Sequence, residues 1–261
     1  MDLTERPDGS FRRHPWETAR TGFFLKVLLD AGVGDRPVRV LDVGAGDGWF
    51  ASQLLAKLPH GSSVACWDTG YESPEEAAAK IAGGADGITC SVDRPPGRFD
   101  VLLLLDVLEH LEEDASFLRS ILDGSLAPGG EGPQMVLVSV PAWQALYSEH
   151  DRRLRHHRRY APGQARRLLE GVGLRVLCGG GLFHALLAPR LLQLAREKLL
   201  PNRPAPKQDL GTWSHGAAVT TAIEWALAAD NALTGLSSRA GVELPGLSWW
   251  ALCELPARPA P

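Results

Sequence analysis

The chain has 261 residues, of which 44% are hydrophobic and 22% charged, and its formal net charge is −4. This length is enough for one large α/β domain with a modest insertion, and the composition is that of an ordinary soluble globular protein. Because the net charge is negative, the protein as a whole has no electrostatic attraction to nucleic acid or to an anionic membrane. This argues against function classes that depend on such attraction.

Cysteine usage and the first residues of the chain predict a reducing compartment. The four cysteines form no CxxC pair; they are Cys66, Cys90, Cys178 and Cys253. Residues 1–13 are polar and lack the apolar stretch of a secretory signal, so we expect reduced thiols and a cytoplasmic location. The longest run without charge, residues 132–148, is interrupted by prolines and is too short to span a bilayer.

The most informative segment joins the first predicted strand to a helix. A leading helix is predicted over residues 15–31, followed by a buried strand over 37–43 and a helix over 47–58. The connecting turn is Gly44-Ala45-Gly46-Asp47-Gly48, and such glycines let a ligand lie against bare backbone at a helix N-terminus. Trp49 stands where a dinucleotide fingerprint needs its third glycine, and no P-loop lysine follows. The turn therefore predicts a nucleotide-type site of another kind.

The second predicted strand ends in a carboxylate. This strand covers residues 62–68 and has Asp68 at its tip. An ionised aspartate accepts hydrogen bonds from both hydroxyls of a ribose, so Asp68 after the glycine turn favours a nucleoside ligand. A helix over 74–82 and a strand over 87–92 follow.

A continuous apolar run predicts a fourth strand that is buried on both faces. It runs from Phe99 to Leu105 and leads into Asp106-Val107-Leu108-Glu109-His110. A helix over 112–126 stops before the breaker cluster 127–130, and a fifth strand over 134–140 ends at Pro141.

The remaining elements complete the predicted sheet. They are a helix over 162–172, a strand over 174–179 and a last strand over 247–255, expected to be antiparallel to its neighbours. The alternation of strands and helices predicts an α/β fold with a seven-stranded, mostly parallel sheet. We divide the chain into an N-terminal helical cap (1–35), a core (36–183 plus 244–258) and a helical insertion before the last strand (184–243).

The insertion contains two predicted helices, 184–200 and 217–236, joined by the stiff proline-rich linker 201–206. In one interpretation these helices only cover apolar surface of the core. In the other they cap the acceptor pocket or touch a lipidic substrate at a membrane surface. The sequence leaves both interpretations open.

Residues 148–160 are strongly basic in an otherwise acidic chain, and they follow the fifth strand on the ligand side of a parallel sheet. Three interpretations compete. One is acceptor recognition with general-base catalysis by His150, His156 or His157. Another is binding of an anionic carboxylate or phosphate by arginines, and the third is a solvated loop with structural arginine–aspartate pairs. A metal site from His150, Asp151 and His156 is disfavoured because the spacing is not that of a helix-borne HExxH motif, and no metal is expected.

Four motifs resemble the class I S-adenosylmethionine-dependent methyltransferases, in particular a bacterial branch with type 11 or type 12 methyltransferase domains. They are the glycine turn with Asp42, the FDV…VLEH stretch, the PGG…LVSVP succession and the segment VPAWQALYSEHD…RHHRRY. Arg155 and His157 depart from the glycine and tyrosine of the last motif, which puts the acceptor in doubt. The resemblance covers residues 14–180. It implies a Rossmann-like fold, S-adenosylmethionine as cofactor and S-adenosylhomocysteine as product.

The resemblance also implies the residues of the site. The cofactor residues are Arg20, Asp42, Gly44, Ala45, Gly46, Asp68, Thr69, Asp106 and Val107. The acceptor residues are His110, Trp143, Tyr147, His157, Arg158, Arg159 and Tyr160. Arg20 lies one turn after Trp16 in the leading helix, and by this resemblance it meets the carboxylate of the cofactor.

We therefore predict a methyltransferase that acts on a small-molecule acceptor, anionic or lipid-linked, with O-methylation favoured over N-methylation. Methyl transfer from a sulfonium needs alignment in a dry pocket, and an oxygen acceptor also needs deprotonation, for which histidine is suited. Two alternatives are a cofactor-binding protein without turnover and a nicotinamide oxidoreductase, which Trp49 opposes. No nucleic acid partner and no transmembrane segment are expected, whereas peripheral membrane contact is compatible with the sequence.

Overall fold

Seven strands form one sheet in the order β3-β2-β1-β4-β5-β7-β6, in a computed structural model that describes residues 12–81, 86–125, 134–199, 213 and 215–256. The strands are β1 (Arg39–Val43), β2 (Ser63–Trp67), β3 (Ile88–Ser91), β4 (Val101–Leu105), β5 (Gln134–Pro141), β6 (Arg175–Leu182) and β7 (Ser248–Leu255). β7 runs antiparallel to both of its neighbours, β5 and β6, and the other pairings are parallel. The predicted α/β fold, with its seven-stranded, mostly parallel sheet and antiparallel last strand, is confirmed.

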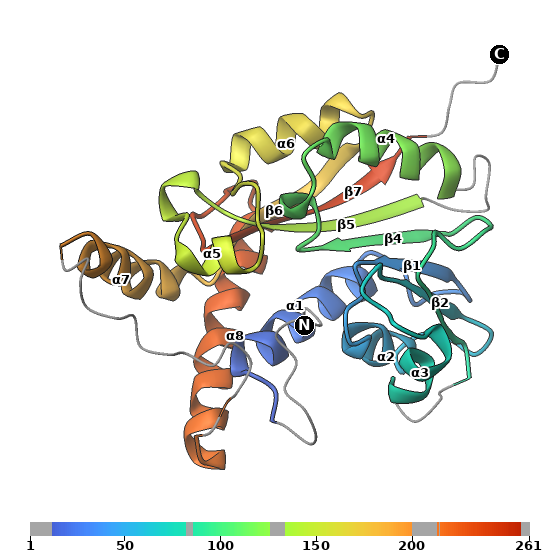
Figure 1. Cartoon of the computed structure of the whole chain (residues 1–261), viewed down its shortest axis with the longest axis horizontal. Coiled ribbons are helices and arrows are strands. Elements are labelled where there is room, and N and C mark those ends of the chain that lie inside the picture. The colour runs from blue at the N-terminus through green and yellow to red at the C-terminus, as the bar shows by residue number, and fades with distance from the viewer. Residues whose placement is uncertain (1–11, 82–85, 126–133, 200–212, 214, 257–261) are drawn as a thin grey trace.

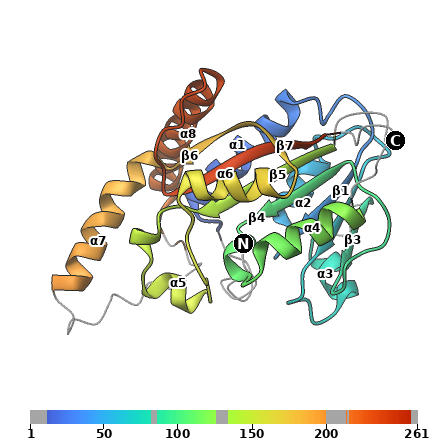
Figure 2. The same cartoon turned by 90° about the horizontal axis from the view of Figure 1, so that it is seen from above.

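Helices cover both faces of this sheet (Figure 1 and Figure 2). They are α1 (Pro15–Asp30), α2 (Trp49–Leu55), α3 (Pro74–Lys80), α4 (Asp114–Ser125), α5 (Glu149–Arg153), α6 (Pro162–Gly171), α7 (Leu187–Leu199) and α8 (Ala217–Arg239). α1, α2 and α8 pack on one face, where α1 and α8 lie side by side, and α4 and α6 pack on the other. Each face of the sheet therefore has its own apolar core.

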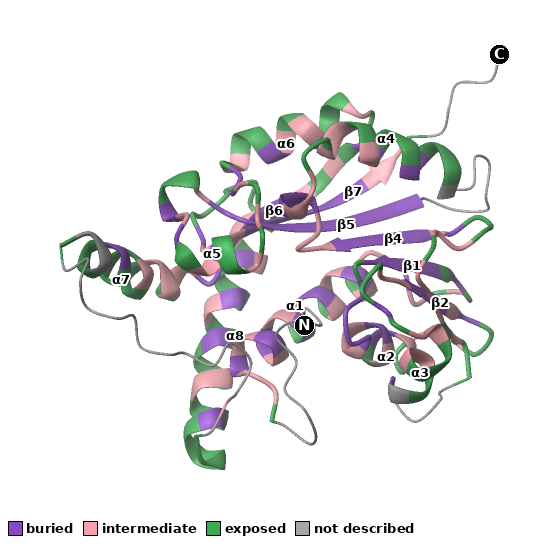
Figure 3. Cartoon of the chain, viewed as in Figure 1, coloured by how far each residue is buried: buried purple, intermediate pink, exposed green. Residues whose placement is uncertain are grey.

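Two consecutive tryptophans of β7 pack into these two cores, one into each. Because side chains alternate along a strand, Trp249 packs on the face of α4 and α6 while Trp250 packs on the opposite face. The ring of Trp250 lies 5.0 Å from that of Phe23 and 6.3 Å from that of Phe24, both on α1. The central strands are buried along most of their length (Figure 3), and all eight residues of β5 are buried. This burial on both faces explains the continuous apolar runs of the sequence.

Some elements differ in extent from the predicted ranges. α2 begins at Trp49 rather than at residue 47, because Gly44, Gly46 and Gly48 all take positive φ and lengthen the turn. β6 continues to Leu182, and α8 continues to Arg239. The basic segment after β5 is not a plain loop, since it contains the short helix α5.

α7 and α8 lie between β6 and β7, in the segment predicted as an insertion. α8 packs on α1 and β6, whereas α7 projects from the sheet (Figure 2) and exposes Leu191, Leu192 and Leu199. In the part of the chain that the structure describes, no helix is long and apolar enough to cross a membrane. Residues 1–11, the breaker cluster 127–130 and the linker 201–206 lie outside the described residues.

The glycines of β6 allow a close approach of backbone to backbone. A Cβ atom on Gly181 would lie 2.2 Å from the nitrogen of Gly246 and 2.5 Å from the oxygen of Leu244. On Gly180 the nearest atom would be a methyl carbon of Thr234 at 3.7 Å, which is an ordinary contact.

We expect Gly181→Ala to lower the free energy of unfolding by about 1 to 3 kcal/mol, because backbone atoms cannot move aside cheaply. Gly180→Ala is the matched control and should change it by less than about 0.5 kcal/mol. Denaturation in urea measures both values. Equal stability of the two variants would contradict this account of β6.

Candidate active site at the carboxyl edge of the sheet

The parallel strands bring four predicted site segments to one edge of the sheet. The glycine turn follows β1, Asp68 follows β2, Asp106 follows β4 and the basic segment follows β5. In an open α/β sheet, ligands bind in the crevice outside the carboxyl ends of the strands. The site is therefore a consequence of strand direction.

The glycine turn is held tightly against β2 and β4. Gly44 has φ 64° and Gly46 has φ 56°, conformations that favour glycine. A Cβ atom on Gly44 would lie 2.8 Å from a methyl carbon of Val107, so this turn has no room for a side chain on that side. Ala45 is buried in the same turn. The result is a cradle of bare backbone in front of α2.

Asp68 fixes the position of this cradle. Its carboxylate accepts hydrogen bonds from the backbone N–H groups of Gly46 and Gly70, both at 2.8 Å. A carboxylate offers about four lone-pair sites, so two bonds leave acceptor capacity for a ligand. Thr69, the next residue, is exposed. The structure thus gives Asp68 a role in the protein itself, which the sequence had not indicated.

Asp42 lies beneath the turn, inside β1. Its side chain is buried, and burial raises its pKa to about 7, with the nearby carboxylates of Asp68 and Asp47 acting in the same direction. Carboxylates crowded under the turn favour a ligand that brings hydrogen-bond donors or positive charge.

Arg20 of α1 reaches the end of β4, where it forms an ion pair with Asp106. Asp106 has φ 58° and also accepts a hydrogen bond from the hydroxyl of Ser139 at 2.9 Å. Desolvation opposes ionisation of Asp106, but the charge of Arg20 and the bond from Ser139 outweigh it and lower the pKa of this carboxyl. The guanidinium of Arg20 also stacks over Trp16, 4.6 Å from the ring centroid.

The basic segment is organised around one buried carboxylate, Asp151. Asp151 accepts hydrogen bonds from Arg159 Nε at 2.7 Å, from the backbone N–H of Ser148 at 2.9 Å and from His156 Nδ1 at 3.0 Å. Burial opposes its ionisation, but the bonds from His156 and Arg159 hold the pKa of Asp151 below its usual range. His156 therefore has its Nδ1 engaged and its Nε2 directed elsewhere.

Other residues of the segment are tied into the protein. Tyr160 is fully buried, and its hydroxyl lies 2.7 Å from a carboxylate oxygen of Asp114 and 3.0 Å from the oxygen of Leu108. Arg158 pairs with the same Asp114 at 3.2 Å. The segment thus contains the arginine–aspartate pairs of the third interpretation, Arg158 with Asp114 and Arg159 with Asp151, although Arg159 is buried rather than solvated.

The other predicted acceptor residues fix this region or lie at its rim. Tyr147 donates its hydroxyl to the oxygen of His156 at 2.7 Å, and Trp143 donates its indole N–H to the oxygen of Gly246 at 2.9 Å. The ring of His110 lies edge-on to that of His156, with centroids 4.7 Å apart. His157 is at the rim, since its side chain is 40% exposed and its Nδ1 lies 3.9 Å from Glu112.

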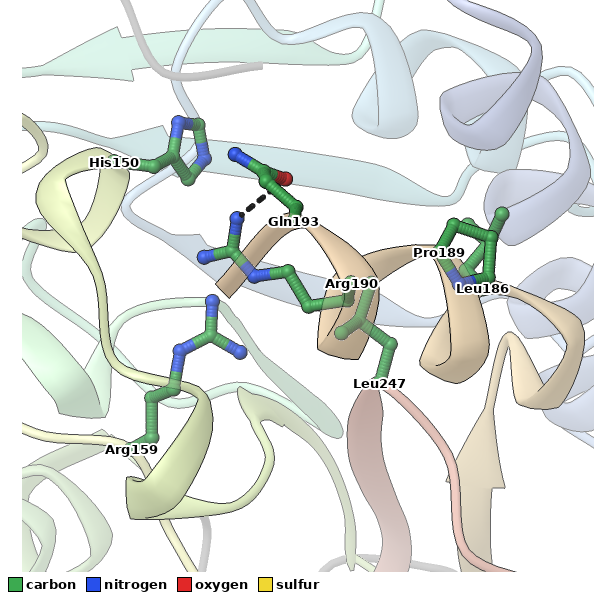
Figure 4. A pocket seen from close by; sticks show the side chains of 7 residues that line it. All are labelled: His150, Arg159, Leu186, Pro189, Arg190, Gln193 and Leu247. Carbon is green, nitrogen blue, oxygen red and sulfur yellow. Dashed lines mark hydrogen bonds between the residues drawn. The ribbon is translucent and has the colours of Figure 1, made fainter. Parts of the chain in front are cut away.

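A pocket of about 270 Å³ opens between the basic segment and α7 (Figure 4). Its lining residues are His150, Arg159, Leu186, Pro189, Arg190, Gln193 and Leu247. Burial lowers the pKa of His150, which favours the neutral imidazole. Arg190 donates to Ser148 Oγ at 2.6 Å and to Asp151 at 3.4 Å, so two arginines face one carboxylate here. Positive charge therefore dominates this pocket.

Sequence reasoning did not identify Arg190 or Glu109 as site residues. Arg190 lies on α7, far along the chain, and the only signal was a helix in which leucine alternates with basic residues. Glu109 was visible only as the neighbour of His110 in the VLEH stretch. Its side chain is fully buried beside the two histidines.

Comparison with known protein families gives a match over much of the chain. The sequence profile of a methyltransferase domain matches residues 12–179. No curated protein sequence matches the chain.

Solved structures share the fold at low sequence identity. A protein from Galdieria sulphuraria, described as a sarcosine dimethylglycine methyltransferase, has a TM-score of 0.53 and 19% identity over 90% of this chain and 85% of its own. A magnesium protoporphyrin IX methyltransferase from Synechocystis PCC 6803, with bound S-adenosylhomocysteine, has a TM-score of 0.52 and 16% identity over 68% and 84%. A cyclase has a TM-score of 0.52 and 18% identity over 90% and 81%. These likenesses establish the fold, and the cyclase illustrates that a fold alone does not define a reaction.

We expect Asp68→Ala to destabilise the ligand-free protein by about 1.5 to 3 kcal/mol, because the turn loses charge-assisted hydrogen bonds to Gly46 and Gly70. Glu72→Ala is the control, since Glu72 is exposed in the same loop. Thermal and urea denaturation measure both variants. If Asp68→Ala is as stable as Glu72→Ala, Asp68 does not hold the turn.

Proposed function

The chain belongs to the methyltransferase-domain family, and from this membership we propose that this class I S-adenosylmethionine-dependent methyltransferase acts on a hydroxyl group of an anionic small molecule or lipid-linked precursor. The family favours methyl transfer over the two alternatives, a binding protein without turnover and a nicotinamide oxidoreductase. S-adenosylmethionine is the cofactor and S-adenosylhomocysteine the product.

The carboxyl edge fits this cofactor. The turn around Gly44, Ala45 and Gly46 offers backbone without side chains, and a Cβ atom on Gly44 would collide with Val107. We assign Asp68 and Thr69 to the ribose, because the carboxylate of Asp68 keeps free acceptor capacity. When bound, the cofactor supplies an electrophilic methyl group on a positively charged sulfur. The crowded carboxylates, Asp42 among them, favour that charge.

We also propose that Arg20 and Asp106, the two partners of one ion pair, bind the cofactor. A guanidinium has five N–H donors, so the pairing with Asp106 leaves donors for the carboxylate of the cofactor. Asp106 and Val107 directly follow β4 beside the glycine turn, where they would border the nucleoside. The ion pair would thus link the helical cap, residues 1–35, to cofactor binding.

The histidines support an oxygen acceptor. An amine presents a lone pair for methylation, whereas a hydroxyl must lose its proton as the new bond forms. Asp151 holds His156 Nδ1 as a donor, so Nε2 is left as the atom with a lone pair. We assign to His156 the promotion of this proton loss and to Asp151 the orientation of its ring. His150, which lines the pocket, is assigned to the acceptor.

The pocket supports an anionic acceptor. Arginine forks suit carboxylate and phosphate, and Arg159 and Arg190 both face the pocket (Figure 4). Arg190 comes from the segment 184–243, so we propose that this insertion caps the acceptor site on the core formed by 36–183 and 244–258. The exposed leucines of α7 offer apolar surface for the chain of a lipid-linked acceptor or for peripheral membrane contact.

The direct test measures methyl transfer from S-adenosylmethionine to matched acceptors that differ only in carrying a hydroxyl or an amine, with and without a carboxylate or phosphate. We expect turnover with the anionic hydroxyl compounds. Arg190→Gln should raise their KM about tenfold or more, the equivalent of one charge-assisted hydrogen bond, while Arg196→Gln on the exposed side of α7 should not. Preferred methylation of the amines would contradict the proposal.

We also expect His156→Ala to lower kcat by about a hundredfold or more, while the affinity for S-adenosylhomocysteine stays near that of the wild type. Asp151→Asn should act in the same direction, because His156 loses its orienting partner. His150→Ala should change KM more than kcat. If His150→Ala instead carries the kcat defect, the assignment of the two histidines must be exchanged.

A further inference from the structure

A fully buried glutamate, Glu109, lies next to the proposed acceptor site. Glu109 is 0% exposed, and both of its carboxylate oxygens lack a hydrogen-bond partner among the described residues. Burial of an ionised carboxylate without a partner is costly, so such a group is either protonated or paired with a cation. Burial raises the pKa of Glu109 well above its ordinary value, with the charge of Asp106 adding to the effect.

Two imidazoles lie beside this carboxylate. Ligand atoms of Glu109, His110 and His156 all lie within 4.8 Å of one another. The rings of the two histidines are nearly perpendicular, at 87°. Such distances among one oxygen and two nitrogens are short enough for a single ion to contact all three.

The three side chains are held in place by the protein. Glu109 and His110 belong to one short 3-10 helix, Leu108–His110, and the backbone N–H of His157 donates to the oxygen of Glu109 at 2.8 Å. The hydroxyl of Tyr160 reaches the oxygen of Leu108 at 3.0 Å. The basic segment is therefore attached to this helix at two positions that follow His156, which gives the cluster a preset geometry.

His156 has the contact expected of a metal-binding histidine. Metal-ligating histidines commonly donate their other ring N–H to a carboxylate, which fixes the ring and makes the ligating nitrogen more basic. His156 Nδ1 donates to Asp151 at 3.0 Å, so its Nε2 is the nitrogen available to an ion. Arg159 and Ser148 in turn hold Asp151.

We propose that Glu109, His110 and His156 bind a divalent cation of the first transition series, such as Zn²⁺ or Mn²⁺, which activates the hydroxyl of the acceptor. One carboxylate and two imidazoles suit such ions, and three protein ligands leave coordination positions open. This set differs from the cluster of His150, Asp151 and His156 that the sequence analysis considered, because Asp151 supports a ligand and Glu109 provides one.

The chemistry of this inference rests on the proposed function. The cation would act as a Lewis acid on the acceptor oxygen and make its O–H group more acidic. The proton passes to solvent water, a lone pair of the oxygen forms the new bond to the methyl carbon, and the bond from that carbon to sulfur breaks with its electron pair remaining on sulfur. His156 would then promote proton loss as a ligand of the cation.

The test uses the full chain, freed of metal with a chelator and titrated with MnCl2 or ZnCl2 in a calorimeter. We expect one ion per chain, and a loss of affinity of about 10- to 100-fold or more in Glu109→Gln and in His156→Ala. His157→Ala and His60→Ala are matched controls, since both rings lie outside the cluster, and should bind the ion as the wild type does. CoCl2 adds a second readout. The visible absorption of Co²⁺ should change when it binds to the wild type, and this change should be absent with Glu109→Gln.

Glu109→Gln keeps the shape of the side chain, and unchanged affinity of each variant for S-adenosylhomocysteine shows that it has folded. Absence of ion binding to the wild type, or binding that Glu109→Gln leaves unchanged, would overturn the inference and identify Glu109 as a neutral buried acid. Hydroxyl methylation that is equally fast in chelator and in metal would overturn the catalytic role and leave the proposed function standing. Ion binding without hydroxyl methylation would leave the site standing and overturn the proposed function.

Discussion

The proposed acceptor side of the site depends on one buried carboxylate. Asp151 is fully inaccessible to solvent, and it binds His156, Arg159 and the first turn of α5, with Arg190 of α7 at its edge. Removing one partner of a buried ion pair typically costs about 3 to 5 kcal/mol, because it leaves an uncompensated charge. The positive side chains of the basic segment would otherwise repel one another, and Asp151 holds them in an ordered arrangement. The same carboxylate binds Nδ1 of His156 and so leaves Nε2 to face the site. Asp151 therefore both orders the segment and orients the imidazole.

The proposed cofactor side depends instead on strand direction. Parallel strands end at one edge, so Asp68 and Asp106 approach the glycine turn although they are far apart in sequence. Asp68 then connects the turn after β1 to the end of β2 through Gly46, and Arg20 connects α1 to the end of β4. These contacts use backbone and charge rather than side-chain shape. The contacts around Asp151, in contrast, orient the side chains of His156 and Arg159.

The sequence predicted the parts that depend on local periodicity. The apolar run of β4, the last strand and the glycine turn all follow from the spacing of neighbouring residues. It did not predict the partner of Asp151 on α7 or the burial of Glu109. Arg190 reaches the site because α7 lies beside residues 144–148, where Arg190 donates to Ser148 Oγ. Tyr160 and His157 attach the basic segment to the short helix that carries Glu109. Neither contact has a local signal, since each joins segments that are distant in the chain.

Two carboxyl groups that follow β4 lie between the proposed cofactor side and the proposed acceptor side. Asp106 and Glu109 are separated by three positions, yet the pKa of the first is lowered and that of the second is raised. The difference comes from their surroundings. Arg20 and Ser139 supply positive charge and a donor to Asp106, whereas burial and the charge of Asp106 raise the pKa of Glu109. Environments that separate the pKa values of neighbouring acids assign them different tasks. The ion pair with Arg20 favours the charged form of Asp106, whereas the charged form of the buried Glu109 is costly, and a cation at the proposed metal site would offset that cost. At the proposed metal site, the charge would thus depend on what binds there, whereas the Arg20–Asp106 ion pair is part of the fold itself.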